Sequence, residues 1–220
     1  MKKILSASLL AAMLFVPASS FAAQDEITLP TVSARSDELT VTQALRQRKS
    51  SRNFVDKDLK PAQLSKILWA ADGINRADTQ KHVNPAAMGV YSVEVYAVTR
   101  EGIYLYDAEK HRLKLIAEGD HRALTTTGQG FVSKAAVNLV YVENPAAWQN
   151  ARHTPPPRES QLSSANITVG AMVQSVALAA QTEGLGNCVR GSINRVEFAK
   201  VARLSADKTI LLAQSVGKCN

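Results

Sequence analysis

The chain has 220 residues, and its 26 lysines and arginines outnumber its 19 aspartates and glutamates, which gives a formal net charge of +7. This balance favours anionic ligands, but only 5% of the residues are aromatic and no RNA- or DNA-binding motif is present, so we expect no nucleic-acid partner. Two isolated cysteines and four histidines without metal-ligand spacing do not make a zinc site, and we expect no bound metal.

The first 22 residues are typical of a secretory signal peptide. Lys2 and Lys3 precede an apolar run from Ile4 to Val16 that is too short to span a bilayer, and small residues stand one and three positions before Ala23. Cleavage before Ala23 leaves 198 of the 220 residues and removes two lysines and no acid, which lowers the net charge to about +5. We therefore expect a periplasmic or secreted protein with no membrane contact after cleavage; a retained membrane anchor is the alternative.

Export also bears on the two cysteines, Cys188 and Cys219. An oxidising compartment permits a disulfide between them. The sequence does not show whether their Cα atoms lie within bridging distance, so the pairing stays open.

The start of the mature chain predicts an exposed segment and then a helix. Residues 23–36 are polar and have no period, and we expect a single domain over residues 37–220. Thr40 and Gln43 form a capping-box pattern, so the first helix begins here and ends near Lys49.

The following elements mix helices and strands. A second helix begins at Pro61 and ends at Gly73, because its apolar residues recur at i, i+3, i+4 and i+7. The remaining stretches are a loop over 74–90, strands over 91–99, 103–106 and 112–117, a buried strand over 135–143, an exposed loop at 155–157, a helix over 163–183 buried on nearly all sides, and strands over 187–193 and 210–216 with a short helix between them. This order indicates an α+β fold with a central sheet flanked by helices.

A basic segment, Arg48 to Phe54, follows the first helix. It reads Arg-Lys-Ser-Ser-Arg-Asn-Phe, so three cations and two hydroxyls fall within five positions. Arginine forks and serine hydroxyls together bind phosphate well. The alternative is a solvated basic helix end, because cations favour the negative end of the helix dipole.

The basic segment is the first of five motifs that occur in order. The loop from Pro85 to Gly89 enters a strand, a small-residue helix carries Gly170 to Ser175, the stretch from Gly184 to Gly191 follows that helix, and the last strand ends in Val216-Gly217-Lys218. Together these motifs resemble the nitroreductase family of flavin-dependent oxidoreductases over nearly all of the mature chain.

The resemblance implies an α+β nitroreductase-like fold with a mixed central sheet, an FMN cofactor, and an intertwined homodimer with two sites at the subunit interface. The strand meander over residues 91–117 is most similar to the branch related to the thiazole and oxazole dehydrogenases of peptide-modifying systems. The residues that match FMN-contacting positions of the family are Arg48, Lys49, Ser50, Arg52, Pro85, Ala86, Ala87, Arg190, Gly191 and Lys218.

The matched cations would hold the charged parts of the cofactor. By resemblance, Arg48, Lys49 and Ser50 contact the phosphate and the ribityl chain, and Lys218 lies where many members add a further phosphate-binding cation. Arg52 matches a cation near the pyrimidine edge, where it would stabilise negative charge on the reduced ring.

The other matched residues would surround the flavin ring. The loop from Asn84 to Gly89 would cover the ring held by the partner subunit, and backbone N–H groups of Arg190 and Gly191 would face flavin N5. The chain has Ala86 where the family usually has serine, and Arg190 where well-known members have an acid, so we expect the Arg190 charge to favour reduced flavin and to attract an acidic substrate. The chain also ends three residues after Gly217, without the longer tail that adds dimer contacts and phosphate-binding cations in other members.

The leading hypothesis is an exported FMN-dependent oxidoreductase. It would pass a hydride or electrons through flavin N5 to a small acceptor such as a nitroaromatic or a quinone, or dehydrogenate a small substrate. The cofactor carries the chemistry, so no side chain is assigned as a catalytic acid or base. The electron donor stays open, because NAD(P)H is not expected in an oxidising envelope. The alternative is a non-catalytic binding protein on the same fold with a decayed flavin site.

Overall fold

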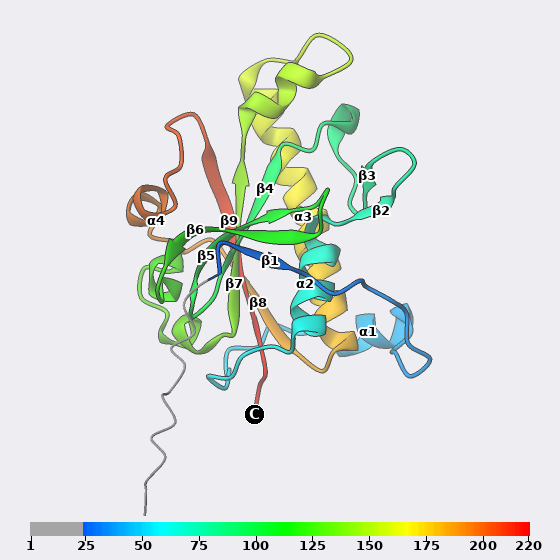
Figure 1. Cartoon of the computed structure of the whole chain (residues 1–220), viewed down its shortest axis with the longest axis vertical. Coiled ribbons are helices and arrows are strands. Elements are labelled where there is room, and N and C mark those ends of the chain that lie inside the picture. Colours follow the sequence, from blue (N-terminus) through cyan, green and yellow to red (C-terminus); the bar gives the residue numbers. More distant parts are fainter. Residues whose placement is uncertain (1–23) are drawn as a thin grey trace, which may run out of the picture.

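The computed structural model describes residues 24–220, so the predicted signal peptide lies outside the described residues. A seven-stranded sheet forms the centre, in the order β1-β6-β5-β4-β7-β9-β8 (Figure 1). The ladders between these strands are antiparallel, and a parallel bridge between Ser50 and Asn187 makes the sheet mixed at its β8 edge. The strands are β1 (Glu26–Thr28), β4 (Val93–Val98), β5 (Gly102–Asp107), β6 (Arg112–Glu118), β7 (Val137–Glu143), β8 (Gly186–Arg190) and β9 (Thr209–Gly217).

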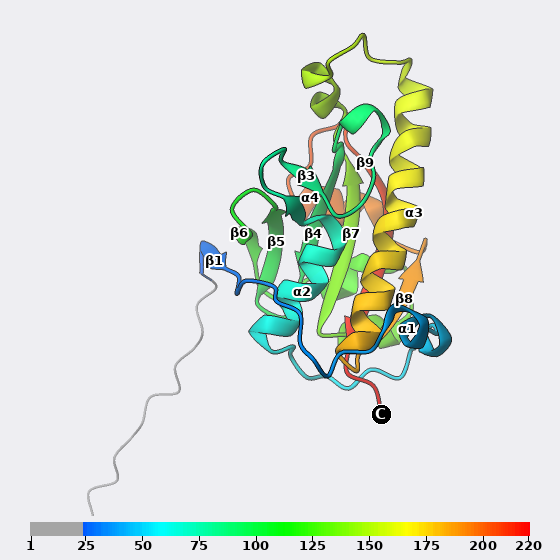
Figure 2. The ribbon, with the colours of Figure 1, turned by 90° about the vertical axis from the view of Figure 1, so that its right-hand side faces the viewer.

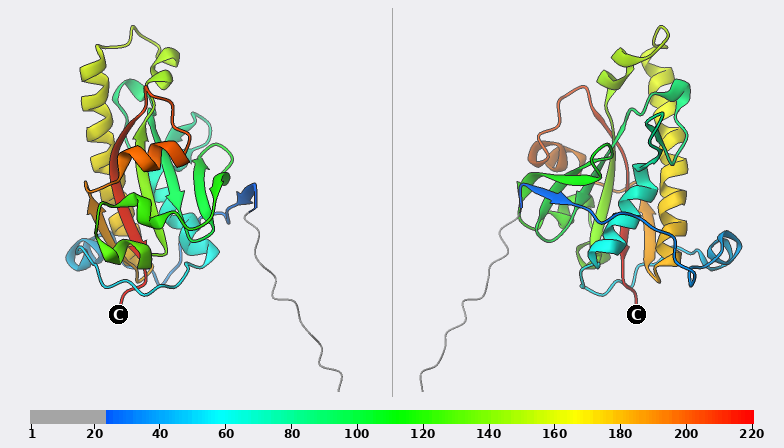
Figure 3. Two further views of the ribbon diagram at one scale, coloured as in Figure 1. Left: turned by 90° about the vertical axis from the view of Figure 1, so that its left-hand side faces the viewer. Right: turned by 45° about the vertical axis from the view of Figure 1, so that its right-hand side comes forward.

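Helices cover both faces of the sheet. α2 (Pro61–Asp72) and α3 (Arg158–Thr182) pack on one face, as Figure 2 shows, and α4 (Arg195–Val201) lies on the other (Figure 3). α1 (Val41–Gln47) contacts α3. The shorter elements are the hairpin strands β2 (Ile74–Arg76) and β3 (Lys81–His82) and the 3-10 helices η1 (Ala87–Gly89), η2 (Arg122–Thr125), η3 (Gly130–Lys134) and η4 (Pro145–Asn150).

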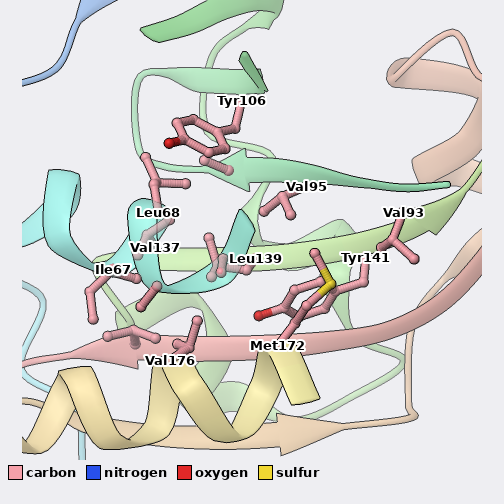
Figure 4. Packing of buried hydrophobic residues seen from close by; sticks show 14 of the residues in the cluster. Ile67, Leu68, Val93, Val95, Tyr106, Val137, Leu139, Tyr141, Met172 and Val176 are labelled. Atoms are coloured by element: carbon pink, nitrogen blue, oxygen red, sulfur yellow. The ribbon is translucent and has the colours of Figure 1, made fainter. Parts of the chain in front are cut away.

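The main core lies between the sheet and the α2–α3 pair. Ile67 and Leu68 of α2, Met172 and Val176 of α3, and Leu139 of β7 are fully buried there (Figure 4). Burying one such side chain contributes about 1.5–3 kcal/mol. A second cluster lies between α4 and the opposite face of the sheet. The two clusters fix the sheet from both sides, and β8 is left at one edge.

Several predicted elements are confirmed. The Thr40 side chain accepts the Gln43 N–H and the Gln43 side chain accepts the Thr40 N–H, so the capping box starts α1. α2 begins at Pro61 and is followed by Gly73. β4, β5 and β6 form the predicted antiparallel meander, and β7 is buried along its whole length between β4 and β9.

Three details of the fold differ from the predictions. Residues 26–28 form β1 against β6 and Leu29 is buried, so the N-terminal segment is not wholly exposed. A strand of three residues is too short to show a period in the sequence. The predicted loop over 74–90 contains the β2–β3 hairpin. α3 begins at Arg158, five residues before the predicted start at Ser163.

α3 is buried on one face only, which corrects the prediction of a helix buried on nearly all sides. Val169 and Met172 face the core, whereas Gly170 and Gln174 are exposed and Ile167 is 75% exposed. By length and composition alone, α3 is the one helix in the described part of the chain that could cross a membrane, but its buried face covers the sheet. Within residues 24–220, nothing covers the exposed face.

Candidate functional site

The basic segment lies along the β8 edge of the sheet and beside the C-terminal tail. The Ser51 N–H donates to the Asn187 carbonyl at 2.8 Å, and the Val55 N–H donates to the Lys218 carbonyl at 2.9 Å. Phe54 also pairs with Cys219 in an antiparallel bridge. These backbone contacts bring together two predicted groups of site residues that are far apart in sequence, the cations after α1 and Lys218.

The charges of this segment are uncompensated. Arg48, Lys49 and Arg52 are exposed, as is Ser50, and Lys218 is half-buried. None of these cations forms an ion pair with a carboxylate of residues 24–220. Four cations and a hydroxyl without an internal counter-charge make a surface that favours a phosphate.

Asn187 adds a buried polar group that the sequence did not single out. It lies opposite Ser50 in the parallel bridge and is 2% exposed. Its Oδ1 accepts the Gln214 Nε2–H at 3.3 Å, but its Nδ2 has no hydrogen-bond partner within the described chain. An unpaired buried donor costs about 1–3 kcal/mol. A ligand with acceptor oxygens beside Ser50 would remove that cost. In the sequence, only the place of Asn187 in the Gly-Leu-Gly-Asn turn marks this residue.

The main chain is exposed directly after the C-terminal end of β8. Gly191 directly follows the strand and is exposed, and a Cβ added there would meet nothing within 4 Å. It lies four residues beyond Asn187, or about 13 Å along an extended strand. The cationic surface around Ser50 and the Gly191 main chain therefore could hold the two ends of an elongated ligand along the sheet edge. These residues fit FMN, which is elongated and carries its phosphate at one end.

The prediction for the Arg190 side chain is wrong. Its guanidinium is buried and donates to Ser215 Oγ at 3.1 Å, to the Thr125 carbonyl at 2.5 Å and to Asn138 Oδ1 at 3.1 Å. Burial lowers its pKa to about 10, against a small opposing effect of Cys188, so it stays charged at neutral pH. Side chains alternate along a strand, and Arg190 falls on the inner side. Its charge therefore does not reach an external substrate.

The covering loop is anchored at its base. Asn84 is buried, donates from Nδ2 to the Ala70 and Ala71 carbonyls at 2.8 Å each, and accepts the Ser175 hydroxyl at 2.6 Å. These contacts tie the loop to the end of α2 and to α3. The loop lies at the opposite end of the molecule from α1 in both views (Figure 1, Figure 2). One chain therefore does not bring Pro85, Ala86 and Ala87 to the basic segment.

A histidine supports the same loop. The His82 ring stacks on Tyr91 with ring centroids 3.7 Å apart, and its Nδ1 lies 2.8 Å from the Asp72 carboxylate. Burial raises the pKa of Asp72, and the hydrogen bond from His82 acts in the opposite direction. His82 precedes the loop and Tyr91 follows it, so their stack joins the two ends of the loop, and the Asp72 contact ties them to the last turn of α2. These contacts hold the loop in place.

The two cysteines lie in one small apolar cluster but are not bonded. Cys188 is buried and Cys219 is half-buried, and both pack with Phe54 and Phe131. A Cβ added at Gly186 would come within 2.2 Å of the Cys219 sulfur, so this glycine lets the C-terminal tail approach β8. Both thiols are free in the structure.

Comparison with known proteins shows the family. The family model described as the nitroreductase family matches residues 45–218. A nitroreductase homologue from Ralstonia eutropha JMP134, known from its crystal structure, is 31% identical; the match covers 98% of this chain and 99% of that chain with a TM-score of 0.82. This chain belongs to the nitroreductase family, and the predicted nitroreductase-like fold is confirmed.

Two more distant structures share the fold. A homologue from Desulfovibrio desulfuricans in complex with FMN is 20% identical, with 83% of this chain and 87% of that chain covered and a TM-score of 0.59. A chain of the Escherichia coli microcin synthetase McbBCD complex with truncated pro-MccB17 bound is 19% identical, with 97% and 85% covered and a TM-score of 0.65. At these identities the likeness shows the fold alone.

Proposed function

We propose that this protein is an exported FMN-dependent oxidoreductase that binds its cofactor along the β8 edge. The observation that carries the proposal is the grouping, in a nitroreductase-family chain, of unpaired cations around Ser50 with the orphaned buried amide of Asn187. A site for a neutral ligand would not need that concentration of uncompensated charge. FMN has a phosphate for the cations and hydroxyl oxygens for the amide.

The chain's own residues then have defined tasks. Arg48, Lys49 and Lys218 bind the phosphate, Ser50 adds a hydroxyl contact, and Arg52 stabilises negative charge near the pyrimidine edge of the ring. Backbone N–H groups at Arg190 and Gly191 would face N5. When bound, FMN supplies two-electron chemistry toward a small acceptor such as a nitroaromatic or a quinone, or in a dehydrogenation of a small substrate.

A homodimer completes the site in this proposal. Within one chain, the covering loop and the basic segment lie at opposite ends of the molecule. Val41 and Leu45 of α1, the helix that directly precedes the basic segment, and Ile167 of α3 are large apolar side chains that residues 24–220 leave exposed. A second copy packed on these helices would cover them and bring its own loop, with Pro85, Ala86 and Ala87, to the cofactor.

Two finer parts of the proposal concern the branch of the family and the location of the protein. The β4–β6 meander supports a place near the thiazole and oxazole dehydrogenase branch. The signal-peptide pattern of residues 1–22 supports a periplasmic or secreted location after cleavage. In such a compartment the donor would be a protein or a quinol rather than NAD(P)H, and the flavin would be acquired after export.

The visible absorption spectrum tests the proposal. Mature protein should retain flavin bands after FMN is added and the excess is removed. Arg48→Ala with Arg52→Ala should weaken FMN binding at least about tenfold, because each removes a charged contact that contributes roughly 1.5–3 kcal/mol. Lys200→Ala with Arg203→Ala removes the same charge from the α4 region and should leave FMN binding unchanged.

The result also separates the two functions. Wild-type protein that stays colourless, or a double variant that binds FMN as tightly as wild type, would contradict the site. A folded but colourless wild type would favour the non-catalytic binding protein, which the missing hydroxyl at Ala86 also supports.

A further inference from the structure

A pocket at the loop end of the molecule lies between three segments that are distant in sequence. The pocket encloses about 370 Å³. Its lining comes from residues 79–81 in the β2–β3 hairpin, residues 88–91 at and after the end of the covering loop, and residues 150–152 at and after the end of η4. Figure 1 shows these segments gathered at the end of the molecule opposite α1. A volume of this size accommodates a small aromatic ligand.

The charged side chains that line the pocket are all positive. Lys81 and Arg152 contribute the charges, Gln80 and Asn150 contribute neutral polar groups, and no acid lines it. Neither cation forms an ion pair with a carboxylate anywhere in residues 24–220. Two uncompensated cations at a concave surface raise the local concentration of anions.

Met88, Val90 and Tyr91 form an apolar part of the lining, and two lining residues have a strained backbone. Met88 is 49% exposed at a φ of 56°, and Gln80 has a φ of 52°. Left-handed backbone costs a non-glycine residue roughly 1–3 kcal/mol and concentrates at functional sites. The Tyr91 ring is fixed by its stack on His82. The pocket therefore combines an anion-binding end with a fixed apolar wall.

We propose that this pocket binds the carboxylate of a small aromatic acid through Lys81 and Arg152, and that it selects acidic electron acceptors. Binding follows from the pocket alone. The link to electron transfer rests on the proposed function, because the Met88–Tyr91 wall continues from the loop that we place over the partner's flavin. Recognition of an acidic substrate is thereby assigned to these two cations and not to Arg190, whose side chain is buried.

A pair of isosteric probes tests this proposal on FMN-loaded protein. Calorimetry measures binding of 4-nitrobenzoate and of neutral 4-nitrobenzamide, and stopped-flow absorbance measures how fast each oxidises dithionite-reduced protein. In the redox step, the nitro group takes two electrons and two protons, releases water and becomes a nitroso group, while the flavin returns to its oxidised form. Wild-type protein should prefer the carboxylate about tenfold in both measurements.

Charge-matched variants identify the residues. Lys81→Gln with Arg152→Gln should remove the preference while leaving the benzamide values unchanged. Lys200→Gln with Arg203→Gln lowers the net charge equally and should keep the preference. Equal binding of both probes by wild type, or loss of the preference in the α4 control, would overturn the proposal.

The two hypotheses fail differently. Carboxylate binding that depends on Lys81 and Arg152, without oxidation of the reduced protein, would support the pocket and contradict the oxidoreductase. Equal oxidation by both probes in wild type and in the double variant would support the oxidoreductase and contradict the pocket.

Discussion

Arg190 is a buried cation that has neutral hydrogen-bond partners but no carboxylate partner within residues 24–220. Its donors satisfy the Thr125 carbonyl and share Asn138 Oδ1 with the Ser215 hydroxyl. Removing the guanidinium would leave these acceptors short of a donor in a site that excludes water. The residue therefore holds η2, β7 and β9 together behind β8.

Arg190→Met should lower the free energy of unfolding by about 3 kcal/mol, because it breaks a buried polar network. Urea unfolding measures this change, and Arg203→Met, at an exposed position after α4, should change it by less than about 0.5 kcal/mol. The same Arg190 variant should keep its preference for 4-nitrobenzoate. A stable variant that loses this preference would place the side chain against the substrate.

Individual site residues differ in how far the sequence predicts them. Three cations and two serines within five positions are visible as a phosphate-binding pattern, and the structure leaves those charges free. The role of Asn187 depends on the missing partner of one amide nitrogen, which only three-dimensional packing defines. The direction of Arg190 depends on which side of β8 faces inward, and a five-residue edge strand does not reveal that in its pattern.

At the scale of elements, the loop from Asn84 to Gly89 depends on contacts at its base. Asn84 makes three hydrogen bonds, two to α2 and one to α3. Asn84→Ala should raise hydrogen exchange over residues 83–90 about tenfold or more, since losing these bonds costs about 1–3 kcal/mol locally. FMN affinity should fall with it, because the loop no longer holds one position.

A matched variant controls for general destabilisation. Asn194 caps α4 by accepting the Glu197 N–H, and α4 lies on the opposite face of the sheet from the loop. Asn194→Ala should cost about 1 kcal/mol of stability and leave FMN affinity unchanged. Hydrogen-exchange mass spectrometry together with an FMN titration compares the two variants. Equal FMN affinities would show that the loop base does not support the cofactor site.

Elements were predictable where one local rule dominates. The capping box at Thr40, the proline at the start of α2 and the alternating meander each carry a strong local signal, and all three are confirmed. The sequence does not predict β1, because this strand forms only through its pairing with β6. It does not predict the β2–β3 hairpin either, because these strands are too short for a hydrophobic period. A long helix was predicted in the region of α3, but its composition does not show which side stays exposed within residues 24–220.

At the scale of the whole molecule, the proposed second copy of the chain would cover the exposed side of α3 and bring together the two separated parts of the proposed site. Ile167, at 75% exposure, lies on this side of α3, and Val196, at 77% exposure, lies on α4. The two residues are therefore a matched pair of exposed β-branched side chains on helices. Only the α3 position would be buried in the proposed homodimer.

Ile167→Arg should convert the dimer to a monomer and remove retained FMN, because a charge buried at an apolar interface costs several kcal/mol and the partner's loop is then absent. Val196→Arg should remain dimeric and keep its flavin. Light scattering after size-exclusion chromatography, with absorbance recorded on the same peak, measures mass and flavin together.

A wild-type monomer that retains FMN would show that one chain holds the cofactor without its partner's loop. An Ile167→Arg dimer would move the interface away from α3. Loss of flavin in step with loss of the dimer would tie the cofactor to assembly, as expected if each site takes its phosphate-binding cations from one chain and its covering loop from the other.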